Sequence, residues 1–138
     1  MEITAVPFAA HNGIQIDDQN NLVLPFEQTV QNHLSGVHAA AQFLLAESAG
    51  GYYLLTAFPS LQGKVMPLLR ESTIQFNQQA YGDLSSSILV SDEAVEKFLR
   101  SMDKRGRAVM DVVVDIADES GNITCRGSFR WFVQMETV

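Results

Sequence analysis

Glu47 is the residue with the clearest potential for chemistry, because it directly follows the apolar run FLLA at 43–46. An ionised carboxylate among apolar side chains costs several kcal/mol unless a cation or hydrogen bonds compensate it. No Lys or Arg precedes Lys64, so the neighbouring sequence offers no cation. Desolvation should then raise the pKa of Glu47 toward neutrality, which suits a general base. The alternative is that Glu47 points to solvent at a helix end near Gly50.

His38 and Asn32 could supply groups that stabilise negative charge. His38 lies in the first turn of the helix that we predict to carry Glu47, where backbone N–H groups are unpaired and partly positive. Such groups can stabilise an oxyanion, and the Asn32 side chain could add an amide donor. A single histidine is more often structural and asparagine is common in loops, so each residue alone also fits a structural role.

The spacing of His38 and Glu47 separates them on that helix. They are nine residues apart, and at about 100° per residue they lie on opposite sides, about 13 Å apart along the axis. They cannot both serve one site in one chain. If both act, Glu47 of one chain must face His38 and Asn32 of another, as in an isologous dimer with two equivalent sites.

The helix that carries these residues is predicted over 36–49, GVHAAAQFLLAESA, between Ser35 or Gly36 and the pair Gly50-Gly51. Apolar residues lie on all of its sides, which indicates a helix that is buried all round. A second, amphipathic helix is predicted at the surface, capped by Ser91 and followed by Gly106.

Strand-like runs fill most of the remaining chain, at 13–17, 22–30, 52–58, about 65–79, 84–90, 108–116 and 123–135. The last two alternate apolar and polar residues, which predicts a half-buried hairpin that pairs Asp111 and Asp115 with Arg126 and Arg130 on its outer face. The sequence therefore predicts an α+β fold in which an antiparallel sheet wraps around one long central helix, as a single domain over 1–138.

Composition excludes several classes of protein. The net charge of −7 argues against nucleic-acid binding, although five of the nine basic residues lie within 97–107. This patch could meet a phosphorylated small molecule, or it could be a solvated helix face. Cys125 is the single cysteine, which excludes an internal disulfide and a cysteine-based metal cluster, and we expect no metal or cofactor. Without a signal-like start or an apolar run near the roughly 18 residues of a membrane span, the expected location is cytoplasmic, with no membrane partner.

The segment 32–47, NHLSGVHAAAQFLLAE, resembles the signature of hotdog-fold thioesterases of the PaaI-like group, and most closely their DUF4442-type bacterial relatives. The resemblance rests on an Asn six residues before the His and an acid nine residues after it, and extends in pattern from Phe8 to about Val133. It implies a hotdog fold and hydrolysis of an acyl thioester, carried by coenzyme A (CoA) or acyl-carrier protein, at a dimer interface.

The resemblance also implies roles for individual residues. Glu47 would orient or activate water, or attack the carbonyl directly. The backbone N–H of Ala39, helped by Asn32, would polarise the thioester carbonyl, and His38 would position the substrate or its sulfur.

Substrate-binding positions follow from the same resemblance. Gly36 would lie against the substrate, and Phe76 would line an acyl tunnel at the dimer interface, although core packing explains an aromatic residue in a strand equally well. Lys104, Arg105 and Arg107 would meet the phosphates of CoA. The homodimer could pair further into a homotetramer.

Two other functions fit the same pattern. A hotdog dehydratase or hydratase also uses a His and an acid, but needs them close together across the interface. A hotdog module could alternatively bind an acyl ligand without catalysis, with Glu47 in a structural role.

Overall fold

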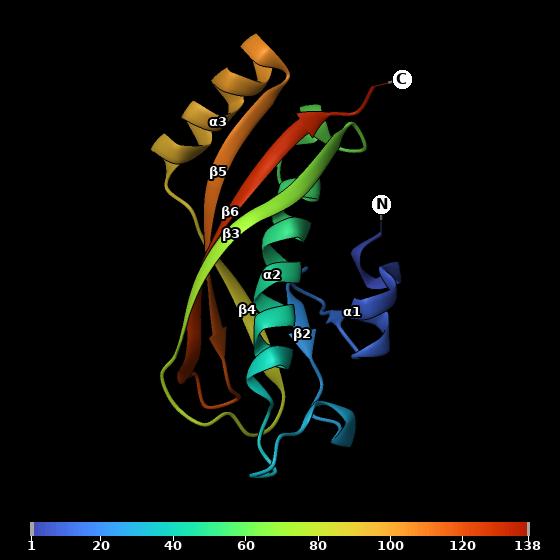
Figure 1. Ribbon diagram of the computed structural model, residues 1–138, viewed down its shortest axis with the longest axis vertical. Coiled ribbons are helices and arrows are strands. Elements are labelled where there is room, and N and C mark those ends of the chain that lie inside the picture. The colour runs from blue at the N-terminus through green and yellow to red at the C-terminus, as the bar shows by residue number, and fades with distance from the viewer. Residues whose placement is uncertain (1, 138) are drawn as a thin grey trace.

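In the computed structural model, which describes residues 2–137, the long helix α2 (Ala39–Thr56) lies along the inner face of a curved six-stranded sheet (Figure 1). All strand pairs are antiparallel and the strand order is β1-β2-β4-β5-β6-β3. The strands are β1 (Gln15–Ile16), β2 (Leu22–Leu24), β3 (Val65–Phe76), β4 (Leu84–Leu89), β5 (Arg107–Ala117) and β6 (Ile123–Met135). The predicted sheet around a central helix is confirmed.

The other helical elements are shorter than α2. The N-terminal segment forms a 3-10 turn η1 (Ile3–Ala5) and helix α1 (Pro7–His11), which the sequence analysis did not predict. Further 3-10 turns are η2 (Gln28–Val30) and η3 (Pro59–Leu61), and the surface helix is α3 (Asp92–Arg105). No helix within residues 2–137 is both long and apolar enough to cross a membrane.

The predicted limits of the central helix were wrong at both ends. The helix begins after His38, which is its N-cap, and it continues through Gly50 and Gly51 to Thr56, so residues 52–56 of the predicted strand at 52–58 are helical. The two glycines do not end the helix because the indole of Trp131, on β6, packs directly against them. A Cβ atom on Gly50 would lie 3.0 Å from this indole, and one on Gly51 would lie 3.3 Å from it. Tertiary packing thus outweighs the low helix propensity of glycine, which costs about 1 kcal/mol per residue relative to alanine.

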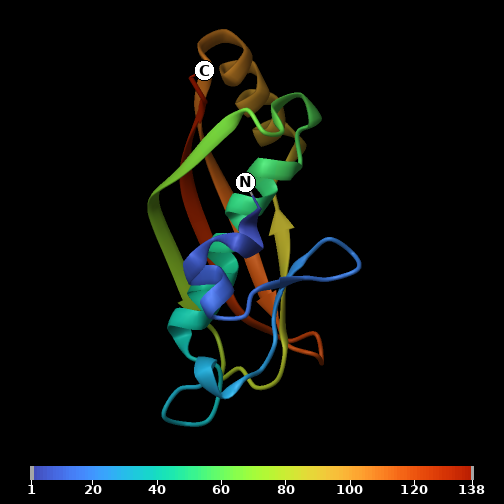
Figure 2. The same ribbon diagram turned by 90° about the vertical axis from the view of Figure 1, so that its right-hand side faces the viewer.

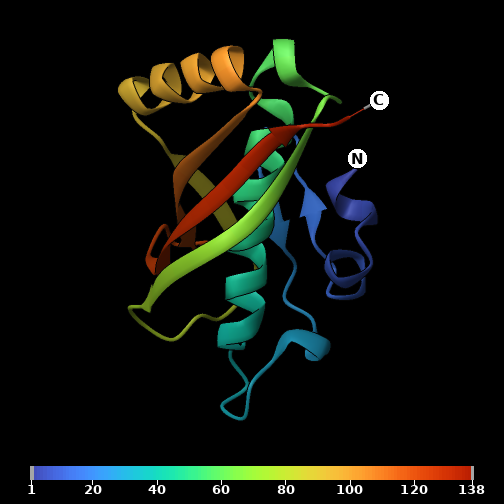
Figure 3. The ribbon, with the colours of Figure 1, turned by 45° about the horizontal axis from the view of Figure 1, so that its top comes forward.

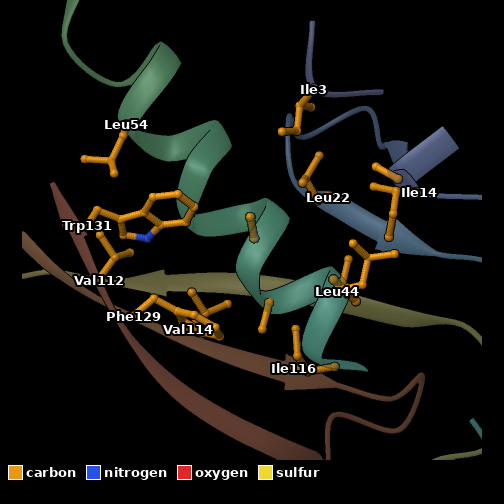
Figure 4. Packing of buried hydrophobic residues seen from close by; sticks show 14 of the residues in the cluster. Ile3, Ile14, Leu22, Leu44, Leu54, Val112, Val114, Ile116, Phe129 and Trp131 are labelled. Carbon is orange, nitrogen blue, oxygen red and sulfur yellow. The ribbon is translucent and has the colours of Figure 1, made fainter. Parts of the chain in front are cut away.

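The core forms on two sides of α2. Toward the sheet, Leu45 and Ala46 are fully buried in one cluster with Val112, Val114 and Ile116 of β5. On the opposite side, the N-terminal segment covers the helix, as Figure 2 shows. In Figure 4, Ile3 and Ile14 from this segment close the core beside Leu22 and Leu44. A strip of α2 that includes Phe43 and Glu47 stays half-buried, so the prediction of burial all round holds for most of the helix only.

The hairpin of β5 and β6 confirms the predicted alternation. Asp111 faces Arg130 and Asp115 faces Arg126 across the two strands, and each pair is joined by a salt bridge. These pairs lie on the outer face, while the alternate apolar residues face α2.

The surface helix and the first strands depend on local sequence signals. The Ser91 hydroxyl accepts from the Ala94 N–H at 3.1 Å, and Gly106 ends α3 with φ +68°, as predicted. The predicted strand at 22–30 stops at Leu24, because Pro25 has no N–H to donate to a neighbouring strand. The runs predicted at 13–17 and 65–79 are likewise shorter, as β1 and β3.

Strand β3 forms one edge of the sheet. It is twelve residues long and, within the described chain, pairs only with β6, with a register shift between Leu69 and Glu71. Two of its apolar side chains, Leu68 and Phe76, are exposed. Figure 3 shows this strand running along the sheet margin beside β6, where it pairs with residues 125–135. A long unpaired edge with exposed apolar residues is a surface suited to strand pairing.

Candidate active site

Glu47 is the ninth of the eighteen residues of α2, so it lies in the middle of the helix and not at its end. Its side chain is half-buried, and none of the ion pairs within residues 2–137 includes it. Burial raises the pKa of Glu47, and no hydrogen bond or neighbouring cation lowers it. The predicted direction of this pKa shift is confirmed. A desolvated carboxylate without a cation is a stronger base than an exposed one, which suits it to accept a proton.

The N-terminus of α2 presents a free backbone donor. The Nδ1 atom of His38 accepts from the Ala40 N–H at 2.9 Å, which caps the helix. An accepting Nδ1 carries no proton, so the ring proton of this tautomer is on Nε2, which has no hydrogen-bond partner within residues 2–137. The N–H of Ala39 has no hydrogen-bond partner in the described part of the chain, and Ala39 is exposed. This is the donor that the sequence analysis expected to polarise a carbonyl.

Asn32 is held in a tight loop just before the helix. Its Oδ1 atom accepts from the N–H groups of Leu34 at 2.9 Å and Gly36 at 3.1 Å, and its own N–H donates to the Gly36 carbonyl at 2.8 Å. These bonds occupy the oxygen of the carboxamide, and its Nδ2 has no partner within residues 2–137. The side chain is therefore oriented with its donor end free.

Gly36 has a packing role in this loop. A Cβ atom there would stand 2.9 Å from the carbonyl oxygen of Ala80, and the N–H of Val37 donates to the same oxygen at 2.8 Å. No side chain fits in this contact, so glycine lets the loop approach the segment that follows β3. Gly36 itself is buried.

A pocket of about 320 Å³ brings several of the predicted site residues together. Asn32 and Ala39 line it from the start of α2, and Phe76 lines it from the end of β3. The remaining lining residues are Val37, Gln42, Gln78, Gln79 and Ala80. No role was predicted for Gln42, although a glutamine inside an otherwise apolar helix is a signal in the sequence that could have indicated one. Glu47 does not line this pocket, in agreement with its place on another side of α2, about 12 Å along the axis from Ala39.

A second hollow, which we call the basic groove, lies between α3 and the outer face of β5 and β6. It has a volume of about 770 Å³, and Lys97, Arg105, Arg107 and Arg130 contribute its cations. Lys104 does not line it. Val109, 59% exposed, and Phe132 form part of its floor. Because α2 packs on the other face of the sheet, the groove and Glu47 of one protomer lie on opposite faces.

Two other kinds of site find no support in the described residues. No group of three or more His, Cys, Asp or Glu within 2–137 could hold a metal ion. Cys125 is fully buried, and burial together with the charge of Asp115 raises the pKa of its thiol to about 11. Such a thiol is a poor nucleophile at neutral pH.

Comparison with known proteins identifies the family and the fold. Residues 6–133 match the model of a family described as "Domain of unknown function (DUF4442)". No curated protein matches the chain. The structure resembles that of PA5026 from Pseudomonas aeruginosa, described as "Probable Thioesterase", with 23% identity, a TM-score of 0.82, and coverage of 97% of this chain and 91% of that one.

Two further solved structures share the architecture. Thioesterase HI1161 from Haemophilus influenzae is 11% identical, with a TM-score of 0.72 and coverage of 96% of this chain and 86% of that one. BH2602 from Bacillus halodurans, solved with CoA, is 19% identical, with a TM-score of 0.71 and coverage of 94% and 76%. These similarities confirm the predicted hotdog fold.

Proposed function

Because the chain belongs to the DUF4442 family, whose fold it shares with thioesterase-like structures, we propose that it hydrolyses an acyl thioester in a homodimer. The observation that carries this proposal is the Glu47 carboxylate, half-buried in the middle of α2 with a raised pKa and no cation beside it. A structural carboxylate would be expected to have a partner, whereas a general base needs a free one.

The free groups at the N-terminus of α2 complement this base. In the proposed reaction Glu47 takes a proton from water, the water oxygen bonds to the thioester carbon, and the carbon–sulfur bond then breaks to release the thiol. The Ala39 N–H and the Asn32 Nδ2 stabilise the oxygen as its negative charge grows. The Nε2–H of His38, at the same helix end, donates a hydrogen bond to the departing sulfur. The proton that Glu47 took from water then passes to that sulfur, which yields the thiol and restores the base. Direct attack by Glu47 on the carbonyl is the other route open to the same residues.

A second protomer is required for this site, since Glu47 and His38 lie on opposite sides of α2, about 13 Å apart along its axis. The unpaired edge of β3 supports a two-fold dimer in which this strand pairs with its equivalent. Phe76, 46% exposed on β3, and the exposed Tyr81 beside Gly36 are apolar surfaces that such a partner would cover. Glu47 of each protomer then faces Asn32, His38 and Ala39 of the other. The molecular mass in solution, measured by light scattering, distinguishes this dimer from a tetramer formed by two dimers.

CoA is the carrier that we propose, with acyl-carrier protein as the alternative. The BH2602 structure contains CoA. The basic groove offers Arg105 and Arg107 to the phosphates of a carrier, in a chain that is otherwise acidic. The acyl chain would run along the half-buried strip of α2 past Phe76.

The test is a thiol-release assay with acyl-CoA substrates of several chain lengths. Wild-type protein should release CoA, and Glu47→Ala should abolish release while the dimer persists in light scattering. Glu96→Ala is the matched control, because Glu96 is an exposed carboxylate on α3 and its loss should leave the rate unchanged.

Two results would contradict the proposal. Hydrolysis by Glu47→Ala at the wild-type rate would exclude Glu47 as the base. Tight acyl-CoA binding by the wild type without turnover would instead favour a binding module, and hydration of an enoyl-CoA without thiol release would favour a hydratase.

A further inference from the structure

We infer that Gln42 is a third hydrogen-bond donor to the carbonyl oxygen of the substrate, beside Ala39 and Asn32. This inference rests on the proposed function and adds a residue that contacts the reacting group. Gln42 lies one helical turn after Ala39, on the same side of α2, and both line the pocket of about 320 Å³.

Gln42 is almost completely buried, with 4% of its surface exposed. A carboxamide buried without hydrogen bonds costs free energy, so its partners determine how it is placed. Its Oε1 atom accepts from the Thr124 hydroxyl of β6 at 2.9 Å. Thr124 is fully buried and makes this contact from 82 residues further along the chain.

The orientation of the Gln42 carboxamide follows from its second partner. The other end of the group lies 3.5 Å from the carbonyl oxygen of Val37. A carbonyl oxygen can only accept, so the NH₂ group must face Val37 and the oxygen must face Thr124. One N–H bond points toward Val37 at the limit of hydrogen-bond length. The second N–H has no acceptor within residues 2–137.

Three residues with an N–H that has no acceptor within residues 2–137 therefore line one pocket. The donors are the backbone N–H of Ala39, the Nδ2 of Asn32 and the Nε2 of Gln42, and none of the residues that line the pocket is charged. Donors without a cation suit an oxygen that is neutral in the ground state and becomes negative during attack, as a thioester carbonyl does. A purely structural Gln42, which only ties α2 to β6, would not need to line a pocket.

The experiment compares two CoA ligands that cannot be hydrolysed. An S-(2-oxoalkyl)-CoA retains a carbonyl group, and the S-alkyl-CoA thioether of equal chain length lacks it. In Gln42→Met the side chain keeps its length and loses its donor. We expect this variant to bind the ketone about tenfold more weakly than wild type and the thioether equally well. Gln28→Met, the same change at an exposed position in η2, is the control and should alter neither affinity.

Each other result overturns the inference. Equal weakening of both ligands would show that Gln42 acts through the fold alone, and an unchanged affinity for the ketone would show that it donates no bond. If Gln42→Met does not fold, Thr124→Val removes the hydroxyl that orients the carboxamide without altering the pocket lining. Thr124→Val should then reduce the ratio of ketone to thioether affinity, and an unchanged ratio would overturn the inference.

Failure of the proposed function gives a different result. Because neither ligand is hydrolysed, the comparison does not depend on turnover. If wild-type protein prefers the ketone but releases no thiol from acyl-CoA, the proposed hydrolysis is contradicted and the role of Gln42 as a donor is supported. If wild-type protein hydrolyses acyl-CoA but shows no preference for the ketone, the role of Gln42 as a donor is contradicted and the proposed hydrolysis is supported.

Discussion

Gly50 of α2 lies directly against the indole nitrogen of Trp131 on β6, where a Cβ atom on the glycine would stand 3.0 Å from Nε1. Figure 4 shows the indole of Trp131 beside α2, near Leu54. This Nε1 is the one buried side-chain nitrogen or oxygen within residues 2–137 that has no hydrogen-bond partner. Close contact with the glycine backbone therefore sets the distance between helix and sheet at this point.

Gly50→Ala should destabilise the protein by about 1–3 kcal/mol, because the added methyl group must displace a buried ring. At an exposed helical position the same change would stabilise by up to about 1 kcal/mol. Chemical denaturation at fixed protein concentration measures the difference. In a double-mutant cycle, the smaller ring of Trp131→Phe should make Gly50→Ala less costly. A stabilising Gly50→Ala would contradict the close contact.

Glu47→Gln should lower the hydrolysis rate by about 10² or more with the fold retained, since a general base contributes about that much. The amide cannot accept the proton from water. The rate of the wild type should also fall as the pH drops through the raised pKa of Glu47, because protonation removes the base. A pH–rate profile of kcat measures both effects, and an unchanged profile in the variant would exclude Glu47 as the titrating group.

The same substitution should raise stability at neutral pH. The pKa of Glu47 is raised in the native state, so between the ordinary and the raised pKa the native state holds the proton and the unfolded state has lost it. Stability therefore falls as pH rises through this window. Glu47→Gln should remove this loss of stability. The difference in free energy of unfolding between the variant and wild type should therefore grow with pH and vanish below the ordinary carboxyl pKa. Urea denaturation across this range tests the sign.

A mixed dimer should reveal the shared site. When one protomer carries Glu47→Ala and the other carries Asn32→Ala, both lesions fall in one site and leave the second site intact. The mixed dimer, purified through two different tags, should recover about half of the wild-type rate. Each homodimer should be strongly impaired. A mixed dimer no faster than the homodimers would mean that the two residues act within one chain.

The basic groove should select the carrier and leave the chemistry unchanged. Arg105→Gln and Arg107→Gln should raise KM for acyl-CoA and leave kcat unchanged, because the lost contacts are to phosphates. Acyl-N-acetylcysteamine, which lacks the nucleotide, should be hydrolysed equally by variants and wild type. Lys104→Gln is the control, since Lys104 does not line the groove. An equal change in KM for acyl-CoA and for acyl-N-acetylcysteamine would show that the phosphates of CoA bind outside the basic groove.

Cys125 should be inert in the native protein. Its thiol is fully buried and its pKa is raised to about 11, so almost no thiolate forms at neutral pH. Reaction with a chromogenic disulfide reagent should require unfolding, and its rate should rise with denaturant. Rapid labelling without denaturant would indicate that the core around β6 opens in the native state.

Local patterns in the sequence were sufficient to predict much of the structure. The caps of α3 at Ser91 and Gly106 depend on contacts within one turn, and the alternation in β5 and β6 depends on a repeat of two residues. The spacing of Asn32, His38 and Glu47 likewise indicated both the family and the separation of the acid from the histidine. Such features are readable because the interacting residues are close in the chain or follow its period.

Only the tertiary structure decided where α2 ends and what lies beside the Ala39 donor. Gly50 and Gly51 predict a helix end by their own propensity, and the indole of Trp131, about eighty residues later, reverses that prediction. The bond between Thr124 and Gln42 spans 82 residues, and it orients the donor that lines the pocket. Neither contact leaves a local or periodic signal, because packing between distant segments depends on shape and distance in the folded chain.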